Sequence, residues 1–197
     1  MARKAKRSTK SAKRRTPARK AAKKAAARKA PAKKAAKRAA SARAAAPARP
    51  NVTPYLVLRG AAEAIEFYKK ALGAIESYRM PMPDGSRLMH AELRIGGSPI
   101  FVADEFPEIN TGTHSPNALG GTTGSIHLTV KDIDATFKRA VDAGMTVVFP
   151  LADMFWGDRF GKLRDPFGHQ WSMGMQVRKL TPEQIAEGAK AAFAPKS

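Results

Sequence analysis

The most informative segment for the fold is Asp165-Pro166-Phe167-Gly168-His169-Gln170-Trp171, because it places a turn signal directly before a strand signal. Asp-Pro and Phe-Gly are typical of a tight turn, and polar and apolar side chains alternate from Gln170 to Met173 after it. Residues 160–164, before the turn, also have the pattern of a strand. We therefore predict a β-hairpin whose turn is formed by residues 165–168.

The residues upstream of this hairpin complete a module. We expect a strand over 125–130, a helix over 133–143 that ends at Gly144, and a strand over 146–149. The same order occurs earlier in the chain. It comprises a strand at 52–58, a helix at 62–72 ending at Gly73, a strand at 88–95, a Gly96-Gly97 turn and a strand at 99–103.

Matching landmarks in the two halves have a constant spacing. Gly73 and Gly144 are 71 residues apart, and so are Gly97 and Gly168. Internal similarity at a fixed period indicates a repeated structural unit. We therefore predict an α+β fold made of two βαβββ modules.

The predicted domain spans residues 51–178, with modules at 52–105 and 124–175. After it, Thr181-Pro182-Glu183-Gln184 has the form of a helix N-cap with a capping box. We expect a C-terminal helix over residues 181–194 that docks on the domain or on a partner subunit.

Residues 1–50 differ from the rest of the chain in composition. They contain 20 Lys and Arg, 20 Ala and no Asp or Glu, whereas the remainder contains 16 basic and 16 acidic side chains. The segment has no Leu, Ile, Phe, Tyr or Trp, so it cannot bury enough apolar surface to offset chain entropy. We predict a basic tail that is disordered when free.

A flexible polycation binds phosphate backbones by displacing counterions, without reading sequence. The Lys/Ala/Pro pattern is similar to that of linker-histone tails, and we predict binding to DNA or another polyanion. The cations expected to make these contacts are Lys20, Lys23, Lys24, Arg28, Lys29, Lys33, Lys34, Lys37 and Arg38. A solubilising tail and an organelle transit peptide stay open as alternatives.

The absence of cysteine excludes a disulfide framework, a thiolate zinc site and a catalytic thiol. No stretch approaches the roughly 20 apolar residues that cross a bilayer, and the N-terminus lacks the apolar core of a secretory signal. We expect a cytoplasmic, nucleoid-associated protein that does not bind membranes.

Strand side chains alternate between two faces, which sorts the candidate site residues. In 125–130, Ile126 and Leu128 should pack on helices, so His127 and Thr129 face a cavity. By the same rule Gln170 and Ser172 face it on the last strand, where Phe101 is the counterpart of Ser172 in the first module. In 88–95 the expected helix-facing set is Met89, Ala91, Leu93 and Ile95, and the cavity set is Leu88, His90, Glu92 and Arg94.

Three segments resemble the vicinal oxygen chelate superfamily, which includes glyoxalase I, bleomycin-resistance proteins and extradiol dioxygenases. They are Ala64-Ile65-Glu66-Phe67-Tyr68 with Leu72-Gly73, His127-Leu128-Thr129-Val130-Lys131-Asp132, and the stretch 165–171. The likeness covers residues 52–175 and is greatest for the PhnB-like branch. It implies curved mixed sheets around a cavity, a small-molecule ligand and frequently a homodimer.

Metal-binding members of this superfamily use one ligand on the first and one on the last strand of each module. The matching positions here are Thr53, Phe101, His127 and Ser172, and only His127 is a good ligand. Because a divalent metal needs three or four N or O donors, we expect no cofactor and no glyoxalase I activity.

Three interpretations of the cavity stay open. A divalent metal is possible at a shifted site of His90, Glu92 and His127. Alternatively His127 or His90 acts as a general base beside Glu92, with Arg94 or Arg159 holding an anionic substrate in lyase, isomerase or dioxygenase-type chemistry. The favoured interpretation is a metal-free binding site. Its expected ligand-binding residues are Tyr55, Phe101, Thr129, Trp156, Arg159 and Ser172.

The two other histidines are expected outside the site. His114 lies in the linker, where we expect it to be solvated, and His169 should be a residue of the turn edge. Each histidine also has a purely structural interpretation, because a lone His on a strand is usually a packed or solvated side chain.

Overall fold

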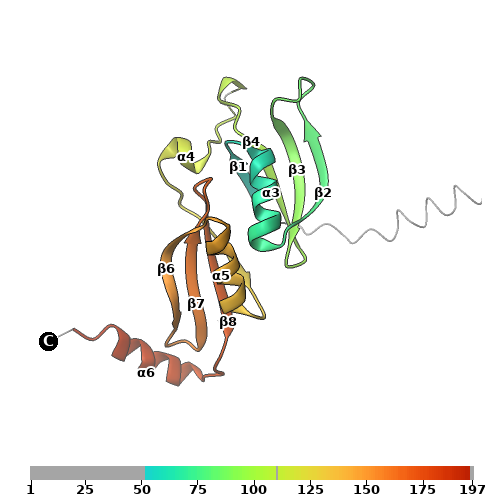
Figure 1. Ribbon diagram of the computed structural model, residues 1–197. Coiled ribbons are helices and arrows are strands. Elements are labelled where there is room, and N and C mark those ends of the chain that lie inside the picture. Colours follow the sequence, from blue (N-terminus) through green and yellow to red (C-terminus); the bar gives the residue numbers. More distant parts are fainter. Residues whose placement is uncertain (1–51, 110, 196–197) are drawn as a thin grey trace, which may run out of the picture. The chain divides into compact units, whose positions relative to one another are not determined.

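A computed structural model describes residues 52–109 and 111–195 of the chain (Figure 1). These residues belong to a compact unit that spans Pro50–Ser197. The predicted disorder of residues 1–50 and their predicted contacts with DNA lie outside the described residues.

The first module forms one four-stranded sheet, here called sheet A. Its elements are β1 (Tyr55–Leu58), α3 (Ala61–Leu72), β2 (Ile75–Pro81), β3 (Leu88–Ile95) and β4 (Ser98–Asp104). The strand order is β1-β4-β3-β2, in which β1 runs parallel to β4 and the other pairs are antiparallel. The predicted βαβββ order is confirmed for this module.

The second module repeats this arrangement in sheet B. Its elements are β5 (Ser125–Thr129), α5 (Ile133–Ala143), β6 (Thr146–Asp153), β7 (Asp158–Arg164) and β8 (Gln170–Gln176). The order is β5-β8-β7-β6, again with one parallel pair, between β5 and β8. The α+β class and the duplication predicted from the sequence are therefore confirmed.

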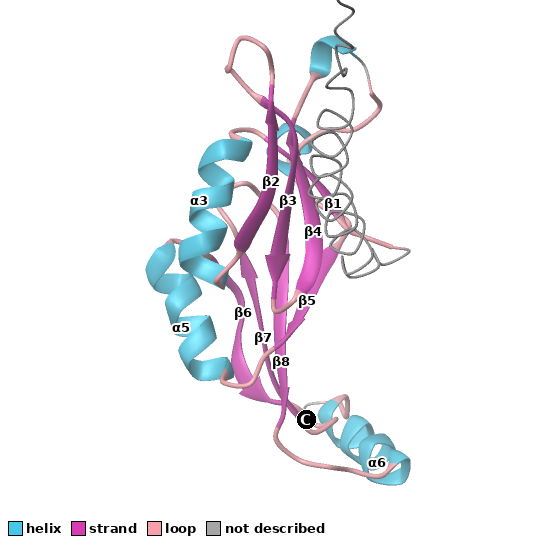
Figure 2. Ribbon diagram, turned by 90° about the vertical axis from the view of Figure 1, so that its right-hand side faces the viewer, coloured by secondary structure: helices cyan, strands magenta, loops and turns pink. Residues whose placement is uncertain are grey.

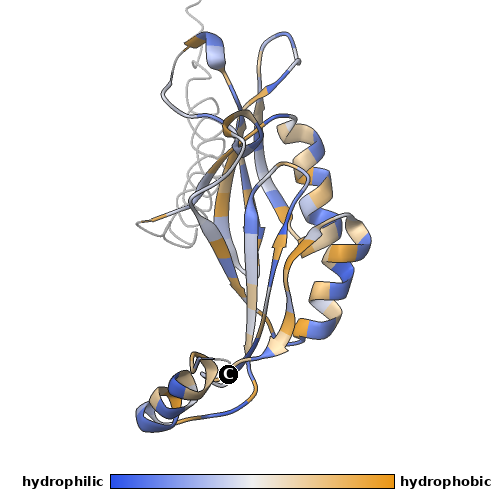
Figure 3. Ribbon diagram, turned by 90° about the vertical axis from the view of Figure 1, so that its left-hand side faces the viewer, coloured by the Kyte–Doolittle hydropathy of each residue, from blue (hydrophilic) through white to orange (hydrophobic). Residues whose placement is uncertain are grey.

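The two module helices begin and end where the sequence indicates. Asp132 caps α5 by accepting a hydrogen bond from the backbone N–H of Ala135. Both helices end at a left-handed glycine, Gly73 with φ 67° and Gly144 with φ 118°, a conformation that a Cβ would strain. Hydrophobic and hydrophilic positions alternate along both helices (Figure 3), which gives each an apolar side to bury.

The core lies where α3 and α5 pack on each other and on the two sheets (Figure 2). Tyr68 of α3 and Trp171 of β8 are completely buried there, with ring centroids 5.3 Å apart. Burying one large apolar side chain stabilises a fold by about 1.5–3 kcal/mol. This helix-to-helix packing leaves one face of each sheet without a covering helix, and we call these the open faces.

Asp165, the first residue of the predicted turn at 165–168, joins the two modules. Its Oδ1 accepts hydrogen bonds from the backbone N–H groups of Phe167 and His169, both at 2.9 Å. Its Oδ2 accepts from the hydroxyl of Tyr68 at 2.7 Å and from Nε1 of Trp171 at 2.8 Å. The predicted turn is confirmed, and its carboxylate also holds a residue of the first module.

One strand breaks the predicted alternation. Leu88 was expected on the cavity side of β3 and Met89 on the helix side, yet Leu88 is buried and Met89 is 38% exposed. The reason is a register shift, since Met80 pairs with His90 but Pro81 pairs with Leu88. Met89 is the extra residue and forms a β-bulge, which turns the preceding side chain, Leu88, to the other face.

The remaining segments are short, apart from the last helix. The linker holds η1 (Pro107–Ile109) and α4 (Pro116–Leu119), and α6 (Pro182–Ala192) follows β8. The predicted capping box of α6 is present, with Thr181 as N-cap and Gln184 as its reciprocal partner. In the part of the chain that the structure describes, no helix is long and apolar enough to span a membrane.

Candidate functional site

The open face of sheet A is centred on the imidazole of His90. Its ring lies 4.9 Å from the ring of Phe101 and 5.5 Å from that of Tyr55, measured between centroids, and Tyr78 borders it at 6.2 Å. These residues come from all four strands, and the pairing of β3 with β4 sets Glu92 directly beside Phe101. The face is therefore an aromatic surface that surrounds one imidazole and one carboxylate.

Three polar side chains of this face lie next to one another, in the order Tyr55, His90 and Glu92. The hydroxyl of Tyr55 is 3.1 Å from Nδ1 of His90, and Nε2 of the same ring is 3.7 Å from a carboxylate oxygen of Glu92. Partial burial raises the pKa of the Tyr55 phenol above its ordinary value, because desolvation disfavours the phenolate. The same hydroxyl lies 3.4 Å from the backbone oxygen of Met89, so its single proton can be donated to that oxygen, to the imidazole or to a ligand.

The open face of sheet B is centred on Phe160. The His127 ring is parallel to it at 6.3 Å, and Phe149 and Trp156 contact it at 6.0 and 5.8 Å. Nδ1 of His127 lies 3.0 Å from Oγ of Ser172, its direct partner in the β5–β8 pairing. This surface resembles that of sheet A in being aromatic with one imidazole.

Local structure explains why His127 points to this face. The alternation predicted for β5 holds, because Ile126 and Leu128 pack against the core and His127 lies opposite. Gly174 on β8 leaves the necessary space, since a Cβ there would be 2.9 Å from Cε1 of His127. The imidazole thus lies against a glycine of the neighbouring strand.

His127 and Thr129 also line a pocket of about 520 Å³. Its other walls are Val52 and Pro54 before β1, residues 95, 96 and 98–100 of the β3–β4 hairpin, and Ile126, Leu128 and Trp171. Pockets of this size are typical of sites for small organic ligands.

Several predicted site residues lie elsewhere. Arg159 was expected to hold an anionic ligand in the cavity, but its guanidinium contacts Asp134 of α5 at 2.7 Å and Asp153 at 3.1 Å. It therefore lies on the helix side of sheet B, with both partners neutralising its charge. Arg94 donates to the backbone oxygen of Gly97 at 2.8 Å, which holds it at the hairpin turn.

The comparison with protein families covers most of the domain. The model of the Glyoxalase/Bleomycin resistance protein/Dioxygenase superfamily matches residues 53–173. The chain belongs to this superfamily. An uncharacterized protein of Mycobacterium bovis is 50% identical over 137 residues, which cover 69% of this chain and 90% of that protein.

Solved structures agree with the superfamily fold. A gene product of Arabidopsis thaliana has 30% identity and a TM-score of 0.52 over 63% of this chain and 97% of its own. TioX from Micromonospora sp. ML1 has 27% identity and a TM-score of 0.52 over 65% of this chain and 99% of its own.

The strand register corrects one position in the predicted superfamily metal set. In sheet B, His127 of the first strand pairs with Ser172 of the last. In sheet A the equivalent pair is Tyr55 with Phe101, so the first-strand position is Tyr55 and not Thr53. The four positions therefore hold a phenol, a phenyl ring, an imidazole and a hydroxyl.

This donor set does not fit a divalent metal. A phenyl ring has no lone pair to donate, and the Tyr55 oxygen is already 3.1 Å from His90. His90 and Glu92 lie on sheet A and His127 on sheet B, so the residues of the shifted site are not brought together on one sheet. Across residues 52–109 and 111–195, no three His, Cys, Asp or Glu side chains are grouped closely enough to hold a metal ion.

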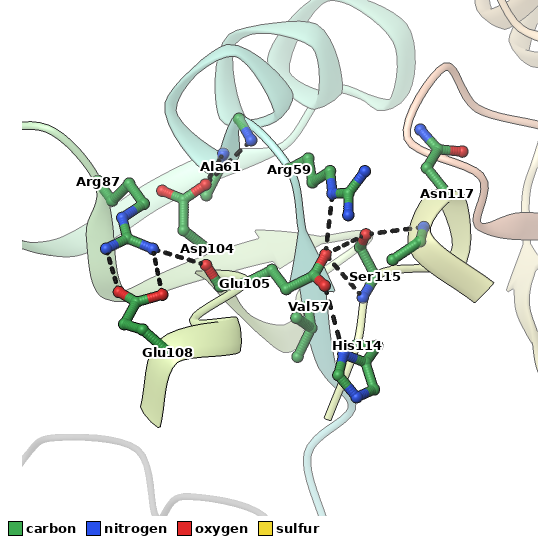
Figure 4. A network of polar contacts seen from close by, with 12 residues as sticks. Val57, Arg59, Ala61, Arg87, Asp104, Glu105, Glu108, His114, Ser115 and Asn117 are labelled. Carbon is green, nitrogen blue, oxygen red and sulfur yellow. Dashed lines mark hydrogen bonds and ion pairs between the residues drawn. The ribbon is translucent and has the colours of Figure 1, made fainter. Parts of the chain in front are cut away.

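Sequence reasoning missed a buried polar network at the end of β4 (Figure 4). Asp104 accepts hydrogen bonds from the backbone N–H groups of Gly60 and Ala61 at the start of α3, and of Leu88. Glu105 contacts Arg59 and accepts from the backbone and hydroxyl of Ser115. The hydroxyl of Ser115 in particular lowers the pKa of Glu105 to about 2.

Two histidines predicted to be uninvolved also have partners. His114, expected to be solvated, lies 3.3 Å from Glu105 and joins the network of Figure 4. His169 directly follows the turn, as expected, and its Nε2 lies 3.1 Å from the backbone oxygen of Val57 in the other module. No local sequence signal identifies these contacts, because each joins residues from different elements.

Proposed function

We propose that the domain binds a small, largely apolar organic molecule on its open faces without a metal ion. The observation that carries this proposal is the replacement of metal ligands by aromatic side chains at the superfamily positions. Tyr55 and Phe101 occupy two of them, and the rings of Phe160 and Trp156 extend the surface beside His127. Aromatic side chains supply large contact areas for planar or apolar ligands.

Metal independence can be tested on the purified full-length protein. After incubation with Zn²⁺ or Mn²⁺ and dialysis, we expect metal far below one ion per chain and no shift of the melting temperature. Stoichiometric uptake that disappears in His127→Ala would contradict a metal-free site.

Ligand binding can be measured with the dye 8-anilinonaphthalene-1-sulfonate as a probe. Phe160→Ala removes the ring that contacts three other rings of sheet B, so we expect dye binding to weaken by about two- to tenfold. Ile109→Ala, which changes a side chain that is 63% exposed in η1, serves as the control. Equal binding by both variants would contradict a site on this face.

A second candidate is metal-free acid–base catalysis. It is favoured by the series of Tyr55, His90 and Glu92, in which the imidazole has a phenol on one nitrogen and a carboxylate near the other. In a corresponding mechanism with His127, Ser172 would orient the ring. Turnover of a bound compound that is lost in His90→Gln, with binding retained, would favour the enzyme over the binding protein.

We further propose that residues 1–50 hold the protein on DNA. The support is the charge of this segment, which accounts for the whole net charge of +20. We expect retention on duplex DNA to fall steeply with salt and to be lost when residues 1–50 are removed. If residues 51–197 alone bind DNA equally well at the same salt concentration, the tail does not provide the affinity.

Three finer assignments complete the proposal. We propose a homodimer in which a second copy covers the part of the aromatic surface that a bound ligand leaves exposed, since Tyr55 is 53% and Tyr78 48% exposed in one chain. We propose cytoplasmic, nucleoid-associated localisation as a consequence of DNA binding. We also propose membership of the PhnB-like branch, and a Bacillus cereus protein described as PhnB shares the fold at 20% identity.

A further inference from the structure

The C-terminal helix α6 contacts the β6–β7 turn through Phe155. Gly188 of α6 is packed so closely that an added Cβ would lie 3.1 Å from Cβ of Phe155 and 3.3 Å from its backbone oxygen. The ring of Phe193 follows at 6.0 Å from the Phe155 ring, in an edge-to-face arrangement. An added Cβ would be in tighter contact than is usual, so Phe155 or the helix would have to shift by a few tenths of an ångström, and a longer side chain would require a larger shift.

The segment between β8 and α6 fixes the same turn. The backbone oxygen of Gly157 accepts hydrogen bonds from the N–H groups of Val177 and Arg178, at 3.0 and 2.8 Å. The guanidinium of Arg178 donates to the backbone oxygen of Met154 at 3.0 Å. Both ends of the turn are thus tied to the chain that leads into α6.

In this turn Trp156 lies next to Phe155, and it connects Phe155 with the aromatic rings on the open face of sheet B. The two rings are 4.9 Å apart and nearly perpendicular, and Trp156 meets Phe160 at 5.8 Å. Phe160 in turn is stacked with His127. A continuous series of ring contacts therefore runs from α6 to the imidazole.

We infer that α6 fixes the position of Trp156, and that Gly188 and Phe155 are positioning residues for the aromatic surface of sheet B. Displacing α6 from Phe155 changes the width of the surface between Trp156 and Phe160, and with it the shape of aromatic ligand that fits. The part of this inference that concerns ligands rests on the proposed binding function. The part that concerns Trp156 does not.

The test compares two substitutions to leucine on α6 of the full-length protein. Gly188→Leu places a side chain into the contact with Phe155, whereas Ala186→Leu adds the same side chain at an exposed position of the helix. Trp156 is partly exposed and Trp171, the other tryptophan, is completely buried. Fluorescence quenching by acrylamide therefore reports on Trp156, and Trp156→Phe provides the Trp171 baseline.

We expect Gly188→Leu to increase the quenching of Trp156 and shift its emission to longer wavelength, and Ala186→Leu to match the wild type. Phe155→Ala, which removes the contact without adding bulk, should act in the same direction, with circular dichroism verifying the fold. Unchanged Trp156 quenching in both Gly188→Leu and Phe155→Ala would overturn the inference.

Dye binding separates this inference from the proposed function. If α6 positions the surface, 8-anilinonaphthalene-1-sulfonate should bind about two- to tenfold more weakly to Gly188→Leu than to Ala186→Leu, the loss expected for one aromatic contact. If Trp156 responds to Gly188→Leu but neither Trp156→Phe nor Phe160→Ala affects dye binding, the binding site on this face is refuted while the positioning of Trp156 by α6 is supported.

Discussion

Replacing Tyr68 by Phe tests whether the Asp165 carboxylate joins the two modules energetically. The substitution removes one buried hydrogen bond of 2.7 Å to a charged group and leaves the ring in place. Hydrogen bonds to charged groups contribute about 1.5–3 kcal/mol, so we expect the free energy of unfolding to fall by about that amount. Asp165 keeps its other three donors in this variant.

Asp165→Asn is the stronger form of the same perturbation. An amide must turn its NH₂ either toward two backbone N–H groups or toward the Tyr68 hydroxyl and Nε1–H of Trp171. The hydroxyl can rotate to accept, but the indole N–H cannot, so at least one buried donor faces another donor. We expect a loss of about 2–4 kcal/mol, a large fraction of the stability of a typical domain.

Urea unfolding of the full-length protein at neutral pH measures both losses. Tyr78→Phe is the matched control, because its hydroxyl belongs to a side chain that is 48% exposed, and we expect a change within about 0.5 kcal/mol. The double variant Tyr68→Phe/Asp165→Asn should lose less than the sum of the single losses. A Tyr68→Phe variant as stable as the control would refute a stabilising role for this contact.

Four further outcomes follow from the contacts. Burial and the adjacent Asp165 hold the pKa of Tyr68 well above 10. The stability that the protonated hydroxyl contributes is therefore present below about pH 10 and lost at higher pH. Tyr68→Phe should remove this loss of stability at alkaline pH in titrations of unfolding. The lowered pKa of Glu105, about 2, has the opposite effect on the pH dependence of stability. The stability that this carboxylate contributes is present above about pH 4.5 and lost as the pH falls toward 2. Glu105→Gln should therefore reduce the loss of stability at acid pH in titrations of unfolding. Gly161→Ala should cost about 1–3 kcal/mol in urea unfolding, because the new Cβ would lie 2.6 Å from the Phe137 ring. Thr181→Ala removes the cap of α6 and should reduce hydrogen-exchange protection in its first turn, with about 1 kcal/mol of local stability lost.

The frame of the domain could be predicted from the sequence because its signals are local. Gly73 and Gly144 end helices at left-handed positions, and the turn at 165–168 carries its own capping carboxylate. The alternation in β5 likewise separates His127 from Ile126 with no long-range information. Each of these predictions depends on residues within a few positions of one another.

The errors arise where the result depends on partners in other elements, which are paired strands in two cases and a helix in the third. The first-strand metal position was placed at Thr53, but the register with Phe101 selects Tyr55. The bulge at Met89 is visible only in the pairing of β3 with β2. Arg159 depends on an aspartate 25 residues away in α5. A single sequence does not specify partners of this kind, and alternation alone cannot detect an inserted residue.

Comparison of the two modules shows where their chemistry differs. Glu92 faces Phe101 across the β3–β4 pair, and Lys162 faces Ser172 at the equivalent place in the β7–β8 pair. One repeat thus has an acid where the other has a base. The glycines that end the helices and the parallel pair of first and last strands are common to both modules. These shared positions serve the fold, and the proposed binding function assigns the ligand contacts to the open-face positions at which the two modules differ.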